Sequence, residues 1–364
     1  MAELAHFKNF AKLKDTSVEF NDITVLAGKP GTGKSYVMKF FYAIEETFSL
    51  TLNIKKEELE ILEDFLEKSK NRTQIEIEEL SKELFQKIKM KEENELLDEI
   101  ELRMKNILNS IFINLHQISS EFSVDFAGAL MKHTKETFNM SSMFSESRRK
   151  ITDEVVFVET PLILEFHKHL DRRESKTPYH IESLINILDE DYSFTDDEQD
   201  ELIKRFSKKA NKIIGGDIKS RNGSFVFRRN DNKDYNIFNA SSGTKSIGLL
   251  QYLVTNKALK KGSILFWEEP EVHLHPEWQL RIVELFIELM NAGVKIVFST
   301  HSPYMADYLN AISKKRKISE RVSFNLFQEK DGVVSNHILK DKKDWKKIQT
   351  ELLDPLEEIM WEYL

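Results

Sequence analysis

Residues 28–35 read GKPGTGKS, which matches the complete phosphate-binding loop pattern GxxxxGK[ST]. The apolar run 23–27 before the loop predicts a buried strand, and the apolar stretch 36–44 after it predicts a helix. In this order of strand, loop and helix, backbone N–H groups and a helix N-terminus converge on phosphate oxygens. The loop therefore predicts a site for a nucleoside triphosphate between a buried strand and a helix.

The phosphate loop assigns different tasks to its residues. Lys34 adds a point charge to the phosphates, and the Ser35 hydroxyl is the expected ligand of Mg²⁺. We therefore predict ATP and Mg²⁺ as the cofactors. The residues expected to contact the nucleotide here are Gly28, Lys29, Pro30, Gly31, Thr32, Gly33, Lys34, Ser35 and Tyr36.

Composition narrows the class of protein. The 364 residues are 40% hydrophobic, enough for one large or two ordinary globular domains, and no apolar run has the roughly 20 residues that cross a bilayer. The N-terminus has no secretion signal, so we expect a cytoplasmic protein without membrane contact. The absence of cysteine excludes disulfides and thiolate metal sites.

The formal net charge of −8 gives the molecule no general attraction to nucleic acid. Any contact with DNA would have to be local. Short basic runs are more often solvated surface than binding patches. The candidate runs lie at 148–150, 208–212, 314–317 and 340–347.

The pattern of the chain predicts an α/β fold with a mainly parallel central sheet. We expect residues 1–50 and 220–364 to form a P-loop head, beginning with an antiparallel β-lobe, because buried strands and helices alternate in the last third. Residues 51–219 are expected to form a mostly helical insertion. Positions 54–122 contain neither glycine nor proline, and their irregular apolar spacing favours a compact lobe over a long coiled-coil arm.

Two predicted strands end in polar side chains. The apolar run 263–267 is followed by Glu268 and Glu269, and the run 295–299 leads to His301. The carboxyl ends of parallel strands meet at one edge of a sheet, where phosphates bind. We expect Glu268 to organise Mg²⁺, Glu269 to act as a general base, and His301 to reach the terminal phosphate.

Two further motifs allow more than one interpretation. Glu271, His273 and His275 are potential metal ligands by residue type, but the two histidines are only two positions apart and no cysteine accompanies them. We favour an interface loop for this segment. The helix start at Ser241–Gly243 is either an ordinary N-cap or a second site for a phosphate group.

The order of these motifs resembles that of the ATP-binding-cassette ATPases. The resemblance is strongest to their soluble branch, which contains RecF, the structural-maintenance-of-chromosomes (SMC) proteins and the overcoming-lysogenization-defect (OLD) ATPases. It covers about residues 1–45 and 235–310. Its motifs are the opening FKNF at 7–10, the phosphate loop at 28–35, a degenerate signature at 241–243, the acid-rich EEPE at 268–271 with HLHP at 273–276, and His301.

The resemblance implies an ATPase in which two heads enclose two ATP molecules. In such families the phosphate loop of one head faces the signature helix of the other. On this basis Ser241, Ser242 and Gly243 would act across a homodimer or a larger oligomer. Glu269 would be the base, His301 would contact the γ-phosphate, and 273–276 would lie at the dimer seam.

The chain departs from the family pattern at three positions. Glu268 replaces the usual magnesium-associated aspartate, and Gly243 is followed by Thr244 instead of Glu or Gln. The glutamine that couples Mg²⁺ to the lateral lobe is not identifiable. Glu159, which follows the strand-like run 155–158, is a candidate for that place, and an ordinary strand end is the alternative.

OLD proteins often carry a C-terminal Toprim nuclease. Only about 60 residues follow His301, so we expect no Toprim nuclease here and a separate effector protein instead. The resemblance therefore favours an ATP-driven dimeric switch in a bacterial antiviral or toxin-regulating pair. The alternative is a RecF- or SMC-like ATPase of DNA repair or recombination that contacts double-stranded DNA.

Overall fold

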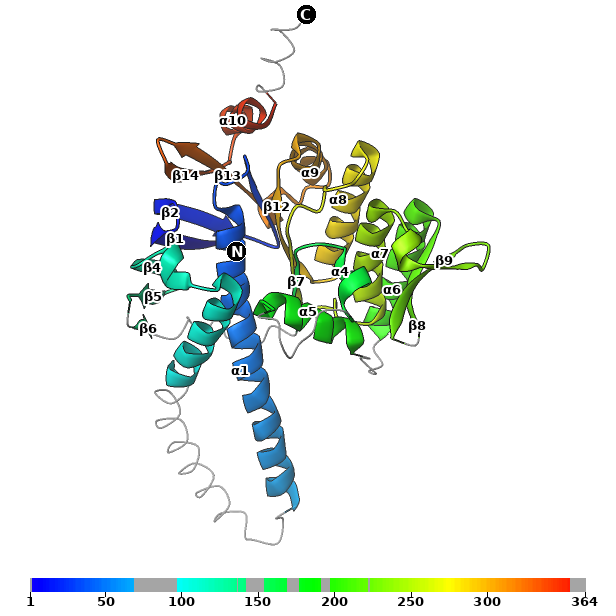
Figure 1. The fold of residues 1–364 in the computed structure, drawn as a ribbon, viewed down its shortest axis with the longest axis horizontal. Coiled ribbons are helices and arrows are strands. Elements are labelled where there is room, and N and C mark those ends of the chain that lie inside the picture. Colours follow the sequence, from blue (N-terminus) through cyan, green and yellow to red (C-terminus); the bar gives the residue numbers. More distant parts are fainter. Residues whose placement is uncertain are drawn as a thin grey trace, which may run out of the picture.

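The computed structural model describes residues 2–68, 97–135, 137–141, 154–168, 177–190, 197–221 and 223–353. Within these ranges eleven strands form one mixed sheet in the order β6-β5-β4-β1-β2-β14-β13-β3-β12-β11-β7 (Figure 1). Its strands are β1 Glu3–Phe10, β2 Leu13–Phe20, β3 Ile23–Gly28, β4 Phe122–Phe126, β5 Ala129–His133, β6 Phe138–Met140, β7 Val155–Val158, β11 Ile264–Trp267, β12 Lys295–Thr300, β13 Val322–Lys330 and β14 Val333–Ile338.

A smaller antiparallel sheet and a set of helices complete the described fold. The small sheet has the order β10-β9-β8. Its strands are β8 Gly216–Arg221, β9 Ser224–Arg229 and β10 Asp234–Asn236. The helices are α1 Lys34–Lys68, α3 Leu115–Ile118, α4 Ile163–Phe166, α5 Tyr179–Asp189, α6 Asp197–Ile214, η2 Ile237–Asn239, α7 Ser242–Thr255, α8 Pro276–Asn291, α9 Pro303–Lys315, η3 Ser319–Arg321 and α10 Lys342–Leu352, with a further helix at 97–112.

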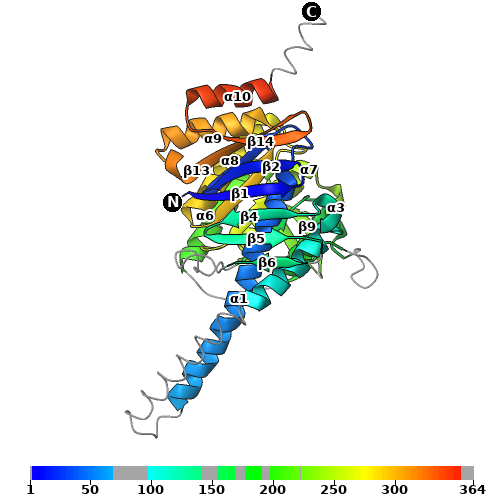
Figure 2. The same ribbon diagram turned by 90° about the vertical axis from the view of Figure 1, so that its left-hand side faces the viewer.

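The large sheet has a parallel half and an antiparallel half. Strands β13, β3, β12, β11 and β7 are parallel to their neighbours in this series. Strands β2, β1, β4, β5 and β6 pair antiparallel, and β14 joins the two halves. Figure 2 shows β1, β4, β5 and β6 side by side at the antiparallel end. This architecture confirms the predicted α/β fold with a parallel central sheet and an N-terminal antiparallel part.

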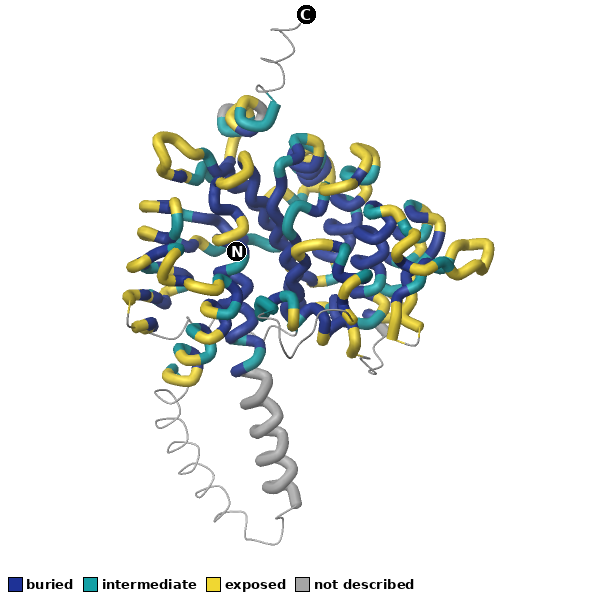
Figure 3. The backbone as a smooth tube through the Cα atoms, viewed as in Figure 1, coloured by how far each residue is buried: buried dark blue, intermediate teal, exposed yellow. Residues whose placement is uncertain are grey.

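Both faces of the parallel half are buried, which is why its strands are almost entirely apolar. Along β11, Leu265 and Trp267 pack into the core beneath α7, α8 and α9, whereas Ile264 and Phe266 pack into a second core beside α1. Figure 3 shows these central strands as buried and the outer turns as exposed. Because successive side chains of these strands point to opposite faces of the sheet, α1 packs on one face and α8 and α9 pack on the other.

Helix α1 corrects the expectation of a compact insertion. It runs without interruption for 35 residues, about 52 Å at 1.5 Å per residue. In Figures 1 and 2 its C-terminal part projects from the body as an arm, beside which the helix 97–112 returns. Neither glycine nor proline occurs between Lys34 and Lys68, so no residue terminates the helix that the phosphate loop begins.

The range 51–219 also differs from the expected helical insertion in its strands. β4, β5, β6 and β7 all lie in this range, and all four belong to the large sheet. β7 pairs in parallel with β11 over its whole length, so it forms an edge of the ATPase sheet itself. Of the helices expected over about 54–122, the part at 69–96 lies outside the described residues.

Candidate functional site

Four parallel strands end at one edge of the sheet and bring the predicted motifs together. β3, β12, β11 and β7 are neighbours in this order. The phosphate loop follows β3, His301 follows β12, Glu268 and Glu269 follow β11, and Glu159 follows β7. We call Lys34, Glu159, Glu268, Glu269 and His301 the strand-edge cluster. Binding sites of α/β proteins form at this edge because loops from adjacent strands converge there.

The phosphate loop has a backbone that only glycine allows at its first position. Gly28 has a φ of +144°, and a Cβ there would lie 2.3 Å from the carbonyl oxygen of Phe327 on the neighbouring strand. Gly31 and Gly33 also have positive φ, at +77° and +84°, and no atom lies within 4 Å of a Cβ built on either. The turn between β3 and α1 therefore keeps an open backbone surface, which fits a phosphate group.

Lys34 is the buried cation of the site, with 4% of its surface exposed. Its Nζ donates hydrogen bonds to the carbonyl oxygens of Gly28 at 2.8 Å and Lys29 at 2.9 Å. Burial lowers the pKa of Lys34 to about 8, while Glu269, Glu271 and Glu268 raise it. The ammonium is thus held inside the loop and close to the carboxylates that follow β11.

Glu268 and Ser35 supply oxygen ligands of the kind that Mg²⁺ prefers. Burial raises the pKa of Glu268 to about 7, and both Lys39 and the Ser35 side chain oppose this rise. Its Oε1 is buried without a hydrogen-bond partner. An unpartnered buried carboxylate oxygen beside a serine hydroxyl fits a cation, with the remaining ligands coming from phosphate and water.

Glu269 and His301 form a direct pair across adjacent strand ends. Glu269 Oε1 and His301 Nε2 lie 2.7 Å apart, and the Nδ1 atom of His301 is buried without a partner. Glu269 has a φ of +44°, an unfavourable conformation for a residue with a side chain, and its N–H donates to the Ser299 hydroxyl at 3.2 Å. Backbone strain of this kind is concentrated at functional sites.

Glu271 anchors the loop that carries His301, a role that the sequence did not reveal. Its Oε1 accepts hydrogen bonds from the Thr300 hydroxyl at 2.8 Å, the His301 N–H at 2.6 Å and the Ser302 N–H at 3.2 Å. Burial raises the pKa of Glu271, and the hydrogen bonds from the His301 N–H and the Thr300 hydroxyl oppose the rise. The carboxylate therefore fixes the backbone of the loop after β12 relative to β11.

Glu159 lies beside Glu268, where β7 ends next to β11. Its Oε2 lies 2.8 Å from His180 Nε2 on α5, and its Oε1 lies 3.3 Å from Lys39 Nζ on α1. The hydrogen bond to His180 is the main cause that lowers the pKa of Glu159 to about 2. Glu159 thus connects the strand edge to two helices, and His180 is a further polar residue of this region that the sequence did not indicate.

The predicted signature residues lie apart from this cluster. The Ser241 hydroxyl caps α7 by accepting from the Thr244 N–H at 3.1 Å, and Gly243 packs where a Cβ would meet Trp278 at 3.2 Å and Leu274 at 3.3 Å. Within the described ranges, no hydrogen bond or ion pair joins Ser241, Ser242 or Gly243 to the phosphate loop. Figure 1 shows α7 on the far side of α8 and β7 from α1.

The histidines of the 271–276 loop have separate roles. His275 begins α8 and accepts a hydrogen bond from the Glu277 N–H at 3.3 Å, while His273 is exposed with a φ of +66°. In the part of the chain that the structure describes, no three His, Asp or Glu side chains are grouped to hold a metal ion. His273 and His275 thus belong to a loop between β11 and α8 that caps the helix.

The sheet order, the phosphate loop and the acids at the strand edge define the class as a P-loop ATPase fold. The family model described as "AAA domain, putative AbiEii toxin, Type IV TA system" matches residues 23–307. The match extends from β3 to α9 and spans most of the chain, so the chain belongs to this family of AAA ATPase domains. The comparison with curated proteins gave no match.

Several solved structures are similar to the chain at low sequence identity. The SMC head domain from Thermotoga maritima is 12% identical with a TM-score of 0.46, covering 93% of this chain and 99% of that one. An Smc head domain from Pyrococcus furiosus, with an extended coiled coil and bound to the C-terminal domain of ScpA, is 14% identical with a TM-score of 0.48, covering 99% and 100%. An ATP-binding cassette of an ABC transporter in its ADP conformation is 12% identical with a TM-score of 0.39, covering 97% and 96%. None of the described helices is both long and apolar enough to cross a membrane.

Proposed function

We propose that this protein binds ATP with Mg²⁺ at the strand-edge cluster and hydrolyses it. The observation that carries the proposal is that the phosphate loop, the acids after β11 and the histidine after β12 meet at one sheet edge. The negative charges of Glu268 and Glu269 raise the pKa of Lys34, and Glu269 pairs with His301. A group of ionisable side chains that includes buried members with shifted pKa values, here Lys34 and Glu268, is typical of catalytic sites. Family membership supports the same class of chemistry.

Each residue of the cluster has a chemical task in this proposal. Lys34 and the loop N–H groups would bind the phosphates, and Ser35 and Glu268 would hold Mg²⁺, which would neutralise charge on the transferred phosphoryl group. Glu269 accepts the proton of the attacking water. His301 orients Glu269 through their 2.7 Å contact. In this proposal it also donates a hydrogen bond to the terminal phosphate.

The signature residues support a further step of the proposal, in which two chains face each other. In the described residues, no hydrogen bond or ion pair joins Ser241, Ser242 or Gly243 to the phosphate loop of their own chain. A second head would bring this glycine-containing helix N-terminus to the nucleotide of its partner. The Glu269→Gln variant with ATP and Mg²⁺ should therefore sediment as a dimer, and a monomer under these conditions would contradict the two-headed arrangement.

We propose that the ATPase works as a switch in a bacterial defence or toxin–antitoxin pair with a separate effector. The description of the family, which refers to a Type IV toxin–antitoxin system, supports this role. Expression of the chain alone and together with its neighbouring gene product, each with and without Lys34→Ala, tests the proposal through cell growth. Growth that never depends on Lys34 would contradict it.

One surface favours the alternative of a DNA-dependent ATPase. Lys204, Lys208 and Lys212 are exposed and four positions apart on α6, so they lie along one side of the helix. Neighbouring Arg205 and Lys209 pair with Glu288. A stripe of lysines follows a phosphate backbone by charge alone, and its binding to DNA falls steeply with salt.

Hydrolysis assays decide between these functions. Phosphate release by the purified chain is measured with and without duplex DNA, and Lys34→Ala defines the background. A turnover that DNA stimulates, and that Lys208→Glu reduces only when DNA is present, favours the DNA-dependent enzyme. Turnover that DNA does not change favours the protein-coupled switch, and turnover equal to that of Lys34→Ala contradicts the ATPase itself.

A further inference from the structure

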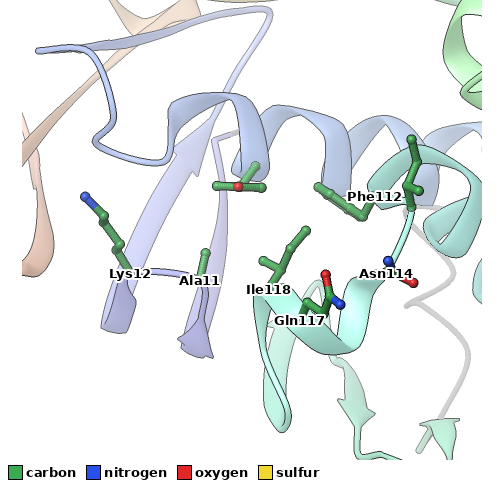
Figure 4. A pocket seen from close by; sticks show the side chains of 8 residues that line it. Ala11, Lys12, Phe112, Asn114, Gln117 and Ile118 are labelled. Carbon is green, nitrogen blue, oxygen red and sulfur yellow. The ribbon is translucent and has the colours of Figure 1, made fainter.

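A pocket of about 560 Å³ opens next to the phosphate loop, on the antiparallel side of the molecule. Its walls come from three places: the turn between β1 and β2, the first turn of α1, and the segment at 112–118. Figure 4 shows Phe112, Gln117 and Ile118 on one side of it and Lys12 on another. A pocket of this size is within the range that holds a small-molecule ligand.

The position of Tyr36 connects this pocket to the phosphate site. Tyr36 directly follows Ser35 in the first turn of α1, and it lines the pocket with 38% of its surface exposed. Phosphates bound to the loop lie over this same helix turn. The pocket therefore begins at the residue that directly follows the phosphate loop.

The walls carry the chemistry that recognises a flat aromatic ring. The rings of Tyr36 and Phe112 lie 5.8 Å apart with an angle of 33°, and Phe10 packs edge-on against both. Gln117 adds an exposed side-chain amide that offers one acceptor and two donors. The charged lining residue, Lys12, is directed to Glu329, to which its Nζ donates at 2.7 Å.

The pocket walls are held in place by the fold. The Ser119 hydroxyl accepts a hydrogen bond of 2.6 Å from the Ala11 N–H, which ties the β1–β2 turn to the 112–118 segment. Ala11, Ile113 and Asn114 have positive φ values of 52°, 46° and 145°, although none is glycine. Such strain persists where the surroundings fix a functional shape.

We propose that this pocket receives the base of a purine nucleotide whose phosphates occupy residues 28–35. This inference rests on the proposed ATP binding and adds the residues that read the base. Phe112 and Tyr36 stack on the ring, and the Gln117 amide pairs with the edge of adenine by donating to a ring nitrogen and accepting from the amino group. Phe112 lies at the end of the helix 97–112 and Gln117 in the short helix α3 that follows it, so base identity is read outside the phosphate-loop motif.

Calorimetric titration of the purified full chain with ADP, GDP and pyrophosphate tests this assignment without turnover. Phe112→Ala should weaken ADP binding roughly tenfold, the loss expected from one stacked aromatic ring. Gln117→Ala should lower the ratio of ADP to GDP affinity about fivefold or more, because the amide contact to the base is lost. Both variants should bind pyrophosphate like the wild-type chain.

His116→Ala is the matched control, because His116 is exposed and adjacent to Gln117 but does not line the pocket. It should leave all three affinities unchanged. Gln117 is also exposed, so its variant should fold even if Phe112→Ala is destabilised.

Unchanged ADP and GDP binding in both pocket variants overturns the base assignment. The base assignment is also overturned if the wild-type chain binds ADP and pyrophosphate with equal affinity, because the base then contributes nothing to binding. A wild-type chain that binds none of the three overturns the proposed function itself. Lys34→Ala separates these results, because it should lose pyrophosphate together with the nucleotides.

Discussion

The strand-edge cluster and the signature helix α7 are built in opposite ways. At the strand edge, Glu269 after β11 pairs with His301 after β12, and Glu159 after β7 pairs with His180 of α5, while Glu268 keeps a buried oxygen without a partner. At the start of α7, the Ser241 hydroxyl accepts a hydrogen bond from the Thr244 N–H, so the cap comes from the same short segment. The difference teaches that the strand edge leaves a buried polar atom without a partner in its own chain, whereas the start of α7 is capped by its own segment.

The buried charges of the two regions also differ. Lys245 on α7 is buried and pairs directly with Glu165 of α4. Behind the strand edge, the buried Glu46 on α1 accepts a hydrogen bond from the Tyr179 hydroxyl at 3.0 Å, and burial raises its pKa to about 7. The signature helix therefore neutralises its buried cation, while the core behind the phosphate site holds a carboxylate that titrates near neutrality.

Loss of the proposed general base, Glu269, should give the largest effect. Glu269→Gln keeps the size of the side chain but cannot accept a proton, so kcat for ATP should fall about 10²- to 10³-fold. ATP binding should stay within about twofold, measured by calorimetry, because the phosphate loop is unchanged. Glu277→Gln, an exposed change in the first turn of α8, is the control. Normal turnover by Glu269→Gln would remove Glu269 from the mechanism.

Loss of the Glu271 anchor should weaken both the fold and the activity. Glu271→Ala leaves the Thr300 hydroxyl and the His301 N–H without their acceptor, at a cost of about 1–3 kcal/mol in unfolding free energy. Because the loop then releases His301, we expect a roughly tenfold lower kcat as well. Glu271→Gln, which keeps an acceptor oxygen, should recover most of both quantities in urea unfolding and phosphate-release assays. A Gln variant as defective as the Ala variant would show that the charge is required.

The buried Glu46 makes a specific prediction about pH. Its folded pKa of about 7 lies above the ordinary value of 4.5, so the folded state binds more protons between these limits. Its contribution to stability is complete below about pH 4.5 and is lost as pH rises through 7, by up to a few kcal/mol. Glu46→Gln should flatten the dependence of unfolding free energy on pH in this window. An identical pH profile for wild type and variant would exclude Glu46 as its source.

Removal of the helix cap at the signature should have the smallest effect. Ser241→Ala should cost about 1 kcal/mol of unfolding free energy, the usual value of an N-cap. Nucleotide affinity of the isolated chain should not change. Ser302→Ala removes the same kind of cap from α9, but its hydroxyl also donates to Gln279 at 2.5 Å beside the strand edge, so this variant should lower kcat as well. Equal kinetics for the two variants would abolish the contrast between the regions.

Local pattern predicted much of the parallel half. The short apolar runs at 263–267 and 295–299 indicated the buried strands β11 and β12, because each run is bounded by polar residues. The arm was missed because irregular apolar spacing was given more weight than the absence of helix-terminating residues between Lys34 and Lys68. β4, β5 and β6 were missed because a strand with one exposed face depends on its neighbours for stability.

At the site, the chemistry that lies within one contiguous motif was predictable, and the chemistry made by distant contacts was not. Lys34 and Ser35 belong to a pattern whose spacing alone determines the loop. The importance of Glu271 depends on donors 29–31 residues away, and that of His180 depends on Glu159, 21 residues away. No local signal marks a side chain whose partners come from another strand.

The sequence by itself determined the phosphate loop, the order of strands and helices in the last third, and the acids that end β11, because these depend on short-range backbone and burial preferences. Tertiary structure alone decided which carboxylates keep a buried oxygen without a partner, which one anchors a loop and which one pairs with His301. It also placed Phe112 and Gln117 beside Tyr36. Burial and hydrogen bonding between distant segments set these roles, and both arise only when the sheet brings its strand ends together.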